Sequence, residues 1–149
     1  AIPRLIDLGG EPFLIASVLN ASIAQRIVRR ICPYCIEQYE PPEEIRNQIK
    51  EVLGDLLPKQ YKDGQKIILS RGKGCNECNL SGYLGRIAIF ELLKITSAIN
   101  KMIVQEASAK DVENLARKDG NLIIMKQDGY LKALEGMTTI QEVLRVAEV

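Results

Sequence analysis

The residues best suited to chemistry in this chain are four cysteines arranged in two identical clips. The clips read Cys32-Pro-Tyr-Cys35 and Cys75-Asn-Glu-Cys78, and the chain has no histidine. A C-x-x-C spacing places two sulfurs on one side of a tight turn, so two facing turns offer four thiolates at the corners of a tetrahedron. Structural Zn²⁺ prefers this ligand set, which leaves no vacant position for water or substrate. The spacing therefore predicts a closed structural zinc site and no catalytic role for the metal.

The cysteines allow two other interpretations, disulfide bonds or free thiols. Disulfides are typical of small secreted domains, and the chain shows no signal-peptide pattern. A redox role would need a thioredoxin-like pattern around one clip, and neither clip has one. Reduced thiols around zinc indicate a cytoplasmic protein.

Length and composition indicate a folded, soluble chain of ordinary kind. Its 149 residues fit one domain or two small lobes, and 46% apolar with 26% charged residues is a usual balance. A net charge of +1 gives no general reason to expect nucleic acid or an anionic membrane as partner. Charged residues interrupt every apolar run before it reaches a membrane-spanning length. The chain begins at Ala1 in mid-pattern, so we expect it to be part of a longer protein.

The first half of the chain predicts short helices and one ambiguous segment. We expect a helix within residues 1–9, a second from Phe13 to about Leu19, and a third from about Glu43 to Leu53. A short strand is expected from Lys66 to Leu69. In Ala21–Ile31, isoleucines recur every four residues as in a helix, while the β-branched content favours a strand. Pattern alone leaves that segment open.

The second half predicts one strand followed by four helices. Gly82–Leu93 is apolar enough for a strand buried on both faces. From Thr96 onward the apolar spacing becomes helical. We expect helices ending near Gln105, running from a Ser108 cap to Gly120, from Ile123 to Leu134, and from Ile140 to Ala147 after a capping box at residues 138–141. Such short helices must pack against one another or against the strand to be stable.

Five segments in a fixed order carry a family resemblance. They are Arg4–Ser17, Ala24–Cys35, Gly82–Leu93, Asp128–Lys132 and Gly136–Leu144. In this order, with the two clips between them, they resemble the C-terminal region of the type II secretion and type IV pilus assembly ATPases. The resemblance covers nearly the whole chain, and only about residues 43–70 match nothing of this kind.

The resemblance implies a mixed α and β fold that forms the C-terminal fragment of a RecA-like ATPase domain. Residues 1–31 and 82–94 would be the end of the RecA-like core, 32–81 an inserted tetracysteine zinc lobe, and 95–149 a helical subdomain. It also implies that Ala21–Ile31 is a strand that pairs with Gly82–Leu93.

The resemblance further implies a motor function for the parent protein. The family is similar in fold to RecA-like motor ATPases, which form hexameric rings, hydrolyse ATP with Mg²⁺ at subunit boundaries and drive pilin or pseudopilin assembly. The expected partners are neighbouring subunits of a homohexamer and platform proteins of the bacterial inner membrane, with no nucleic acid and no direct membrane insertion. The expected location is the cytoplasm, peripheral to that membrane. The sequence does not distinguish among secretion, pilus assembly and DNA uptake, since all three use such motors.

The phosphate-binding loop of the family, G-x-x-x-x-G-K-[ST], has no match in this chain. Arg71–Cys75 has only a superficial likeness, since it lacks the spaced first glycine and the hydroxyl residue. The acidic Mg²⁺-holding segment and the catalytic glutamate of the family are also missing. We therefore assign no catalytic residue, and we expect the parent to be an ATPase and this chain alone to be inactive.

Arg86 is the candidate for nucleotide contact. In the family, the arginine of a G-Y-x-G-R motif lies beside the adenine base, and Gly82–Arg86 keeps that motif. A planar guanidinium can stack on a purine, although an ordinary ion pair, for instance with Glu91, is the alternative. The basic run of Arg26, Arg29 and Arg30 could meet phosphates or acids of a neighbouring subunit, or form a solvated edge.

A free-standing zinc-ribbon module for protein or nucleic acid is the alternative function. A nucleic-acid ribbon should show a basic excess and exposed aromatic residues near its clips. The net charge of +1 does not favour it.

Overall fold

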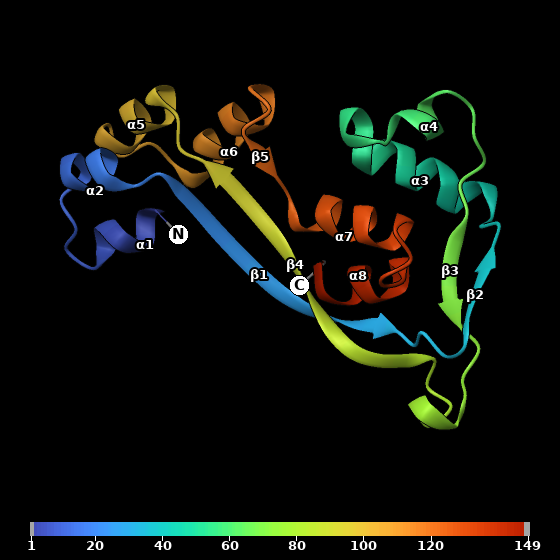
Figure 1. Ribbon diagram of the computed structural model, residues 1–149. Coiled ribbons are helices and arrows are strands. Elements are labelled where there is room, and N and C mark those ends of the chain that lie inside the picture. Colours follow the sequence, from blue (N-terminus) through green and yellow to red (C-terminus); the bar gives the residue numbers. More distant parts are fainter. Residues whose placement is uncertain (1, 148–149) are drawn as a thin grey trace. The chain divides into compact units, whose positions relative to one another are not determined.

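The computed structural model describes residues 2–147 and is a mixed α and β protein (Figure 1). Its helices are α1 (Ile2–Asp7), α2 (Pro12–Val18), α3 (Glu43–Leu53), α4 (Lys59–Lys62), α5 (Ser97–Val104), α6 (Ala109–Lys118), α7 (Met125–Leu134) and α8 (Ile140–Ala147). Its strands are β1 (Ala21–Ile31), β2 (Ile36–Tyr39), β3 (Leu69–Gly72), β4 (Tyr83–Lys94) and β5 (Leu122–Ile123). Short 3₁₀ turns occupy Gly54–Leu56 and Asn76–Cys78.

The strands form two sheets. One sheet has the order β1-β4-β5, and the other is the antiparallel pair of β2 and β3. The ambiguous segment Ala21–Ile31 is therefore a strand that pairs with β4, as the family resemblance implies. Its β-branched residues suit the extended backbone, and β4 supplies the hydrogen-bonding partner that sequence pattern alone does not reveal.

The chain divides into two compact units. Within the described residues, the first unit comprises residues 2–24 and 91–124, and the second comprises 25–90 and 125–147. Strands β1 and β4 contribute residues to both units. The division cuts across the expected helical subdomain of 95–149, because α5 and α6 belong to the first unit and α7 and α8 to the second.

The second unit has a core built from segments far apart in the sequence. Helix α7 packs on α3, on α8 and on strand β3. Gly129 lets α7 approach α8, since a Cβ there would lie 2.4 Å from a methyl carbon of Val143. The fully or nearly fully buried members of this core are Val28, Ile49, Leu53, Leu57, Ile67, Leu69, Ile89, Tyr130, Ala133, Ile140 and Val143.

The first unit has a smaller core between α2, α5 and α6. Its buried residues are Ile2, Ala16, Ile99, Ile103, Val112 and Ala116. Two side chains, Thr96 and Ser108, cap helices of this unit. The sequence predicts the Ser108 cap. The Thr96 hydroxyl accepts a hydrogen bond from the Ile99 amide, and the Ser108 hydroxyl accepts one from the Asp111 amide.

Three details of the predicted elements are wrong. Strand β4 is not buried on both faces, because Leu84 and Phe90 are exposed while Ile89 is buried. The predicted strand Lys66–Leu69 begins at Leu69 and continues to Gly72, since pairing with β2 rather than the apolar run sets its limits. The third C-terminal helix begins at Met125, because Leu122 and Ile123 pair with β4.

Candidate metal centre

The four cysteine sulfurs lie together. All four Sγ atoms are within 4.8 Å of one another, and the cysteines are free of disulfide bonds. The Sγ–Sγ distance is 3.8 Å for Cys32–Cys75, 3.8 Å for Cys35–Cys78 and 3.7 Å for Cys75–Cys78. A tetrahedron with metal–sulfur bonds of about 2.3 Å has edges of about 3.8 Å. The cluster therefore has the dimensions to hold one metal ion with four thiolate ligands.

Backbone hydrogen bonds fix both clips. The Cys32 amide donates to the Gly82 carbonyl at 3.0 Å, and the Lys73 amide donates to the Cys35 carbonyl at 3.0 Å. Both bonds join the first clip to the chain that flanks the second. Gly72 and Gly82 make this approach possible, since a Cβ on Gly72 would lie 2.1 Å from the Gly82 carbonyl oxygen. No side chain fits there without moving backbone, so glycine is required.

Backbone amides also point at the sulfurs. Cys78 Sγ accepts hydrogen bonds from the amides of Cys75 at 3.2 Å and Gly82 at 3.3 Å, and Cys35 Sγ accepts one from Gly74 at 3.3 Å. In the metal-free protein, burial raises the pKa of Cys32, and burial likewise raises the pKa of Cys35 to about 12. Burial acts in the same direction on Cys78, but the hydrogen bonds outweigh it and lower its pKa to about 6. A cation among the four sulfurs would supply the charge that favours all four thiolates.

Arg86 lies on β4, one residue after Gly85, whose φ is +82°. Its side chain is exposed and makes no ion pair within residues 2–147. It lines an open depression together with Arg29, Ser81, Tyr83 and Gly85. The structure therefore leaves the guanidinium accessible.

The three arginines of the basic run have different surroundings. Arg26 and Arg30 are exposed. Arg29 donates through Nη2 to Glu142 Oε1 at 2.6 Å, and its amide donates to Glu142 Oε2 at 3.1 Å. Arg29 is thus a structural partner of α8, which the sequence interpretation of the run does not foresee.

Glu142 is a buried carboxylate that sequence reasoning missed. Its side chain is 3% exposed and also accepts hydrogen bonds from Arg145, at 3.0 and 2.9 Å. Burial opposes ionisation, but the bonds from Arg29 and Arg145 outweigh it and lower the pKa of Glu142 to about 2. The sequence places Glu142 in the first turn of a helix, where an acid is common for other reasons. Only the fold brings Arg29 to it.

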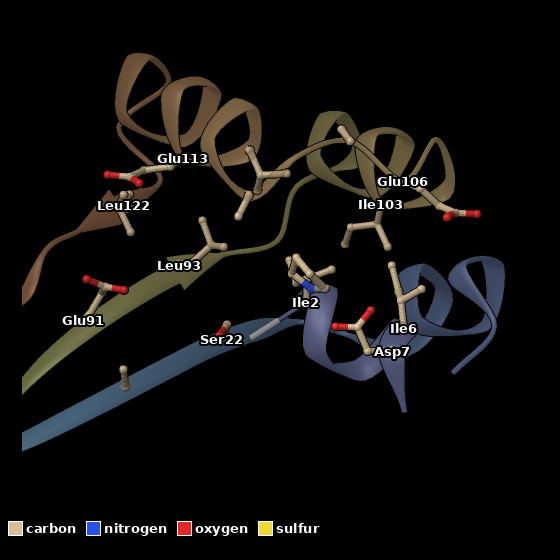
Figure 2. A pocket seen from close by; sticks show the side chains of 15 residues that line it. Ile2, Ile6, Asp7, Ser22, Glu91, Leu93, Ile103, Glu106, Glu113 and Leu122 are labelled. Carbon is tan, nitrogen blue, oxygen red and sulfur yellow. The ribbon is translucent and has the colours of Figure 1, made fainter. Parts of the chain in front are cut away.

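The first unit contains a separate cavity of about 360 Å³ (Figure 2). Ile2, Ile6, Leu93 and Ile103 point into it and give it an apolar floor. Carboxylates stand around it, from Asp7, Glu91, Glu106 and Glu113, and no lysine or arginine lines it among the described residues. It contains none of the site residues predicted from the sequence.

Comparison with known proteins places this chain in a family. The model of the type II/IV secretion system protein family matches residues 1–145. The chain belongs to this family. The alternative of a free-standing zinc-ribbon module is therefore set aside, and the resemblance carried by the five sequence segments is confirmed.

Relatives from both secretion and pilus systems are similar to this chain. It is 39% identical over 145 residues to the type IV pilus assembly ATPase PilB of Thermus thermophilus, covering 97% of this chain and 15% of PilB. It is 38% identical over 148 residues to the type II secretion system ATPase E of Vibrio cholerae, covering 99% and 27%. It is also 38% identical to the type II secretion system protein E of Pseudomonas aeruginosa, covering 98% and 27%. The chain thus spans about a quarter or less of these relatives.

No helix in the described residues is both long and apolar enough to cross a membrane.

Proposed function

We propose that this chain is the C-terminal part of a hexameric, cytoplasmic motor ATPase that powers type II secretion or type IV pilus assembly. The family match over residues 1–145 carries the proposal, and relatives named as ATPases of both systems support it. A RecA-like domain with the phosphate-binding loop would bind ATP and Mg²⁺ in the complete protein. This chain has no such loop, so it should not hydrolyse ATP alone.

The parts of the chain would have separate tasks in that motor. Residues 1–31 and 82–94 would complete the RecA-like core, 32–81 would form the zinc lobe, and 95–149 would supply helical contacts. The partners would be neighbouring subunits of a homohexamer and platform proteins of the bacterial inner membrane. The protein would sit at that membrane through those partners, with neither direct insertion nor nucleic-acid binding.

Cys32, Cys35, Cys75 and Cys78 would hold one structural Zn²⁺. Sulfur–sulfur distances of 3.7 and 3.8 Å support this assignment, since they fit a tetrahedral thiolate site. The ion would neutralise the buried thiolates and fix the two clips to each other. Elemental analysis of the purified full-length protein should give about one zinc per chain, with thiols that react only after chelation and denaturation. Four freely reacting thiols without metal would contradict the assignment.

Arg86 would complete one side of the nucleotide site by stacking on the base. Its exposure and its lack of an ion pair in the described residues support this role, because the guanidinium plane is available. Arg86→Ala in the full-length protein should raise the KM for ATP by roughly tenfold, the ratio that about 1.4 kcal/mol of binding energy gives. Arg71→Ala is the matched control, since Arg71 is an exposed arginine that pairs with Glu37 in the metal lobe. Equal KM values for both variants would contradict the role.

A further inference from the structure

The depression that contains Arg86 is positively charged. Five residues line it, two of which are the arginines Arg29 and Arg86, and none of which is acidic. The nearest carboxylate bonded to this group is Glu142, which lies between Arg29 and Arg145. Even without Arg145, the two arginines that line the depression outweigh this single carboxylate by one positive charge, which attracts anions.

Arg29 is held in place before any ligand arrives. Its guanidinium carbon lies 4.2 Å from the centre of the Tyr83 ring, and Nη2 donates to Glu142 at 2.6 Å. Tyr83 is itself fixed, because its hydroxyl is hydrogen-bonded to the Thr139 hydroxyl at 2.9 Å. A free arginine side chain loses conformational entropy when it binds a ligand, so an arginine that folding has already ordered binds more tightly.

Arg29 also has donors to spare. Its side chain is 50% exposed, and within the described residues only Nη2 and the backbone amide donate to Glu142. Nε and Nη1 therefore have no protein acceptor there, while a guanidinium has five N–H groups in all. These donors suit an anionic oxygen of a phosphate, because the planar guanidinium can direct two N–H groups at a phosphate in parallel.

We infer that Arg29 and Arg86 together form an anion-binding site for a nucleoside phosphate, in which Glu142 acts as the positioning residue for Arg29. This inference rests on the proposed function, since it adds a second contact to the nucleotide that Arg86 would meet. Arg86 would stack on the base, and Arg29 would donate to an oxygen of the same ligand.

Arg145 provides the control that separates binding from folding. Arg29 and Arg145 both bond to Glu142, but only Arg29 lines the depression. A purely structural role for Arg29 predicts similar effects of Arg29→Gln and Arg145→Gln. The inferred role predicts that only Arg29→Gln weakens nucleotide binding.

The experiment uses the full-length protein with a fluorescent ATP analogue as the probe, alongside steady-state ATP hydrolysis. Arg29→Gln should weaken probe binding and raise the KM for ATP at least fivefold, with a smaller change in kcat. Arg29→Lys should recover part of the loss, since it keeps the charge. Arg145→Gln should stay within twofold of the natural protein. Thermal unfolding of each variant shows whether it is folded at the assay temperature. If Arg29→Lys is destabilised, it is assayed at a lower temperature at which it is folded.

The outcomes separate this inference from the proposed function. Equal binding losses in Arg29→Gln and Arg145→Gln would overturn the inference, and the proposed function would stand if Arg86→Ala still raised the KM. Unchanged binding in Arg29→Gln would also overturn it. A natural full-length protein that neither binds the probe nor hydrolyses ATP would overturn the proposed function and the inference together.

Discussion

The two units of this chain are stabilised in different ways. In the second unit, polar contacts join residues far apart in the sequence: Cys32 meets Cys75, and Arg29 meets Glu142, 113 residues away. In the first unit, the side-chain caps are local, such as Ser108 bonded to Asp111 three residues later. Both units leave some large apolar side chains uncovered: Phe13 in the first is 71% exposed, and Leu80 in the second is 74% exposed. The second unit therefore adds specific contacts between distant residues to the larger of the two cores, whereas the first relies on local helix caps and a small core.

The cavity of the first unit and the depression of the second unit also differ, in the charge of the residues that line them. The depression in the second unit is lined by arginines, and the cavity in the first unit by carboxylates over an apolar floor (Figure 2). Opposite charge at the two places means that one anionic ligand cannot serve both. A nucleotide would be attracted to the second unit and repelled from the cavity of the first.

Removing one of the proposed metal ligands should have the largest effect, and it should fall on the second unit. Cys32→Ser is expected to abolish metal binding and to unfold the segment between the clips, because metal binding in small zinc modules contributes on the order of 10–16 kcal/mol to folding. Hydrogen exchange of the full-length protein measures this region by region. Amides of α5 and α6 should keep their protection, since their core contains no cysteine. Uniform loss of protection in both units would contradict the separation described above.

Truncating the buried carboxylate should have the next largest effect. Glu142→Ala removes a carboxylate that accepts hydrogen bonds from Arg29 and Arg145, and it is expected to cost about 2 kcal/mol of unfolding free energy, since both guanidiniums are half exposed and can turn to water. Denaturant unfolding measures the change. Glu135→Ala is the control, because Glu135 is an exposed acid in the turn just after α7. A similar small change in both variants would show that the buried contact contributes little.

The same carboxylate should make stability depend on acid. Folding lowers the pKa of Glu142 from 4.5 to about 2, so the unfolded chain binds this proton more readily than the folded one. The stabilisation is complete above pH 4.5 and is lost as the pH falls toward 2. The stability difference between the natural protein and Glu142→Gln should therefore shrink over that interval. Both proteins contain the cysteine cluster, so its acid sensitivity cancels when they are compared. A stability difference that stays constant from pH 4.5 to 2 would show that Glu142 is not the source of the acid dependence.

A local change in the first unit should be milder. Ser108→Ala removes the hydroxyl that accepts from the Asp111 amide and is expected to cost about 1 kcal/mol. Thermal unfolding followed at α6 measures this loss. Ser108→Thr keeps the hydroxyl, which accepts from the Asp111 amide and donates to the Asp111 carboxylate, and should recover most of it. If Ser108→Thr unfolds as early as Ser108→Ala, the capping bond is not the cause.

The smallest effect is expected at the exposed apolar surface. Phe13→Ser should change the unfolding free energy by less than about 0.5 kcal/mol, because the ring is 71% exposed. Ile99→Ala in the same unit is the contrast, since Ile99 is fully buried and its truncation should cost about 3 kcal/mol. Equal losses in chemical denaturation would mean that Phe13 is covered in the folded full-length protein.

Sequence reasoning succeeded where structure depends on neighbours in the chain. The Ser108 cap, the helix Glu43–Leu53 and the pairing of two C-x-x-C turns follow from local spacing, and the structure contains all three. It failed where distant segments decide. The limits of β3 depend on its register with β2, and the role of Arg29 depends on a glutamate that only folding brings near. Family resemblance supplied the strand Ala21–Ile31, which periodicity left open.

The pairing of Tyr39 with Leu69 has a practical consequence. The segment between them leaves the β2–β3 pair and returns to it, and within it the connection after α4 can be lengthened without stretching the strands. Gly64 lies between α4 and β3, with φ at +95° and no other atom within 4 Å of where a Cβ would be. A short peptide tag or a fluorophore-carrying loop grafted at Gly64 should leave the cysteine cluster intact, and it would let single particles of the full-length protein be followed by light microscopy.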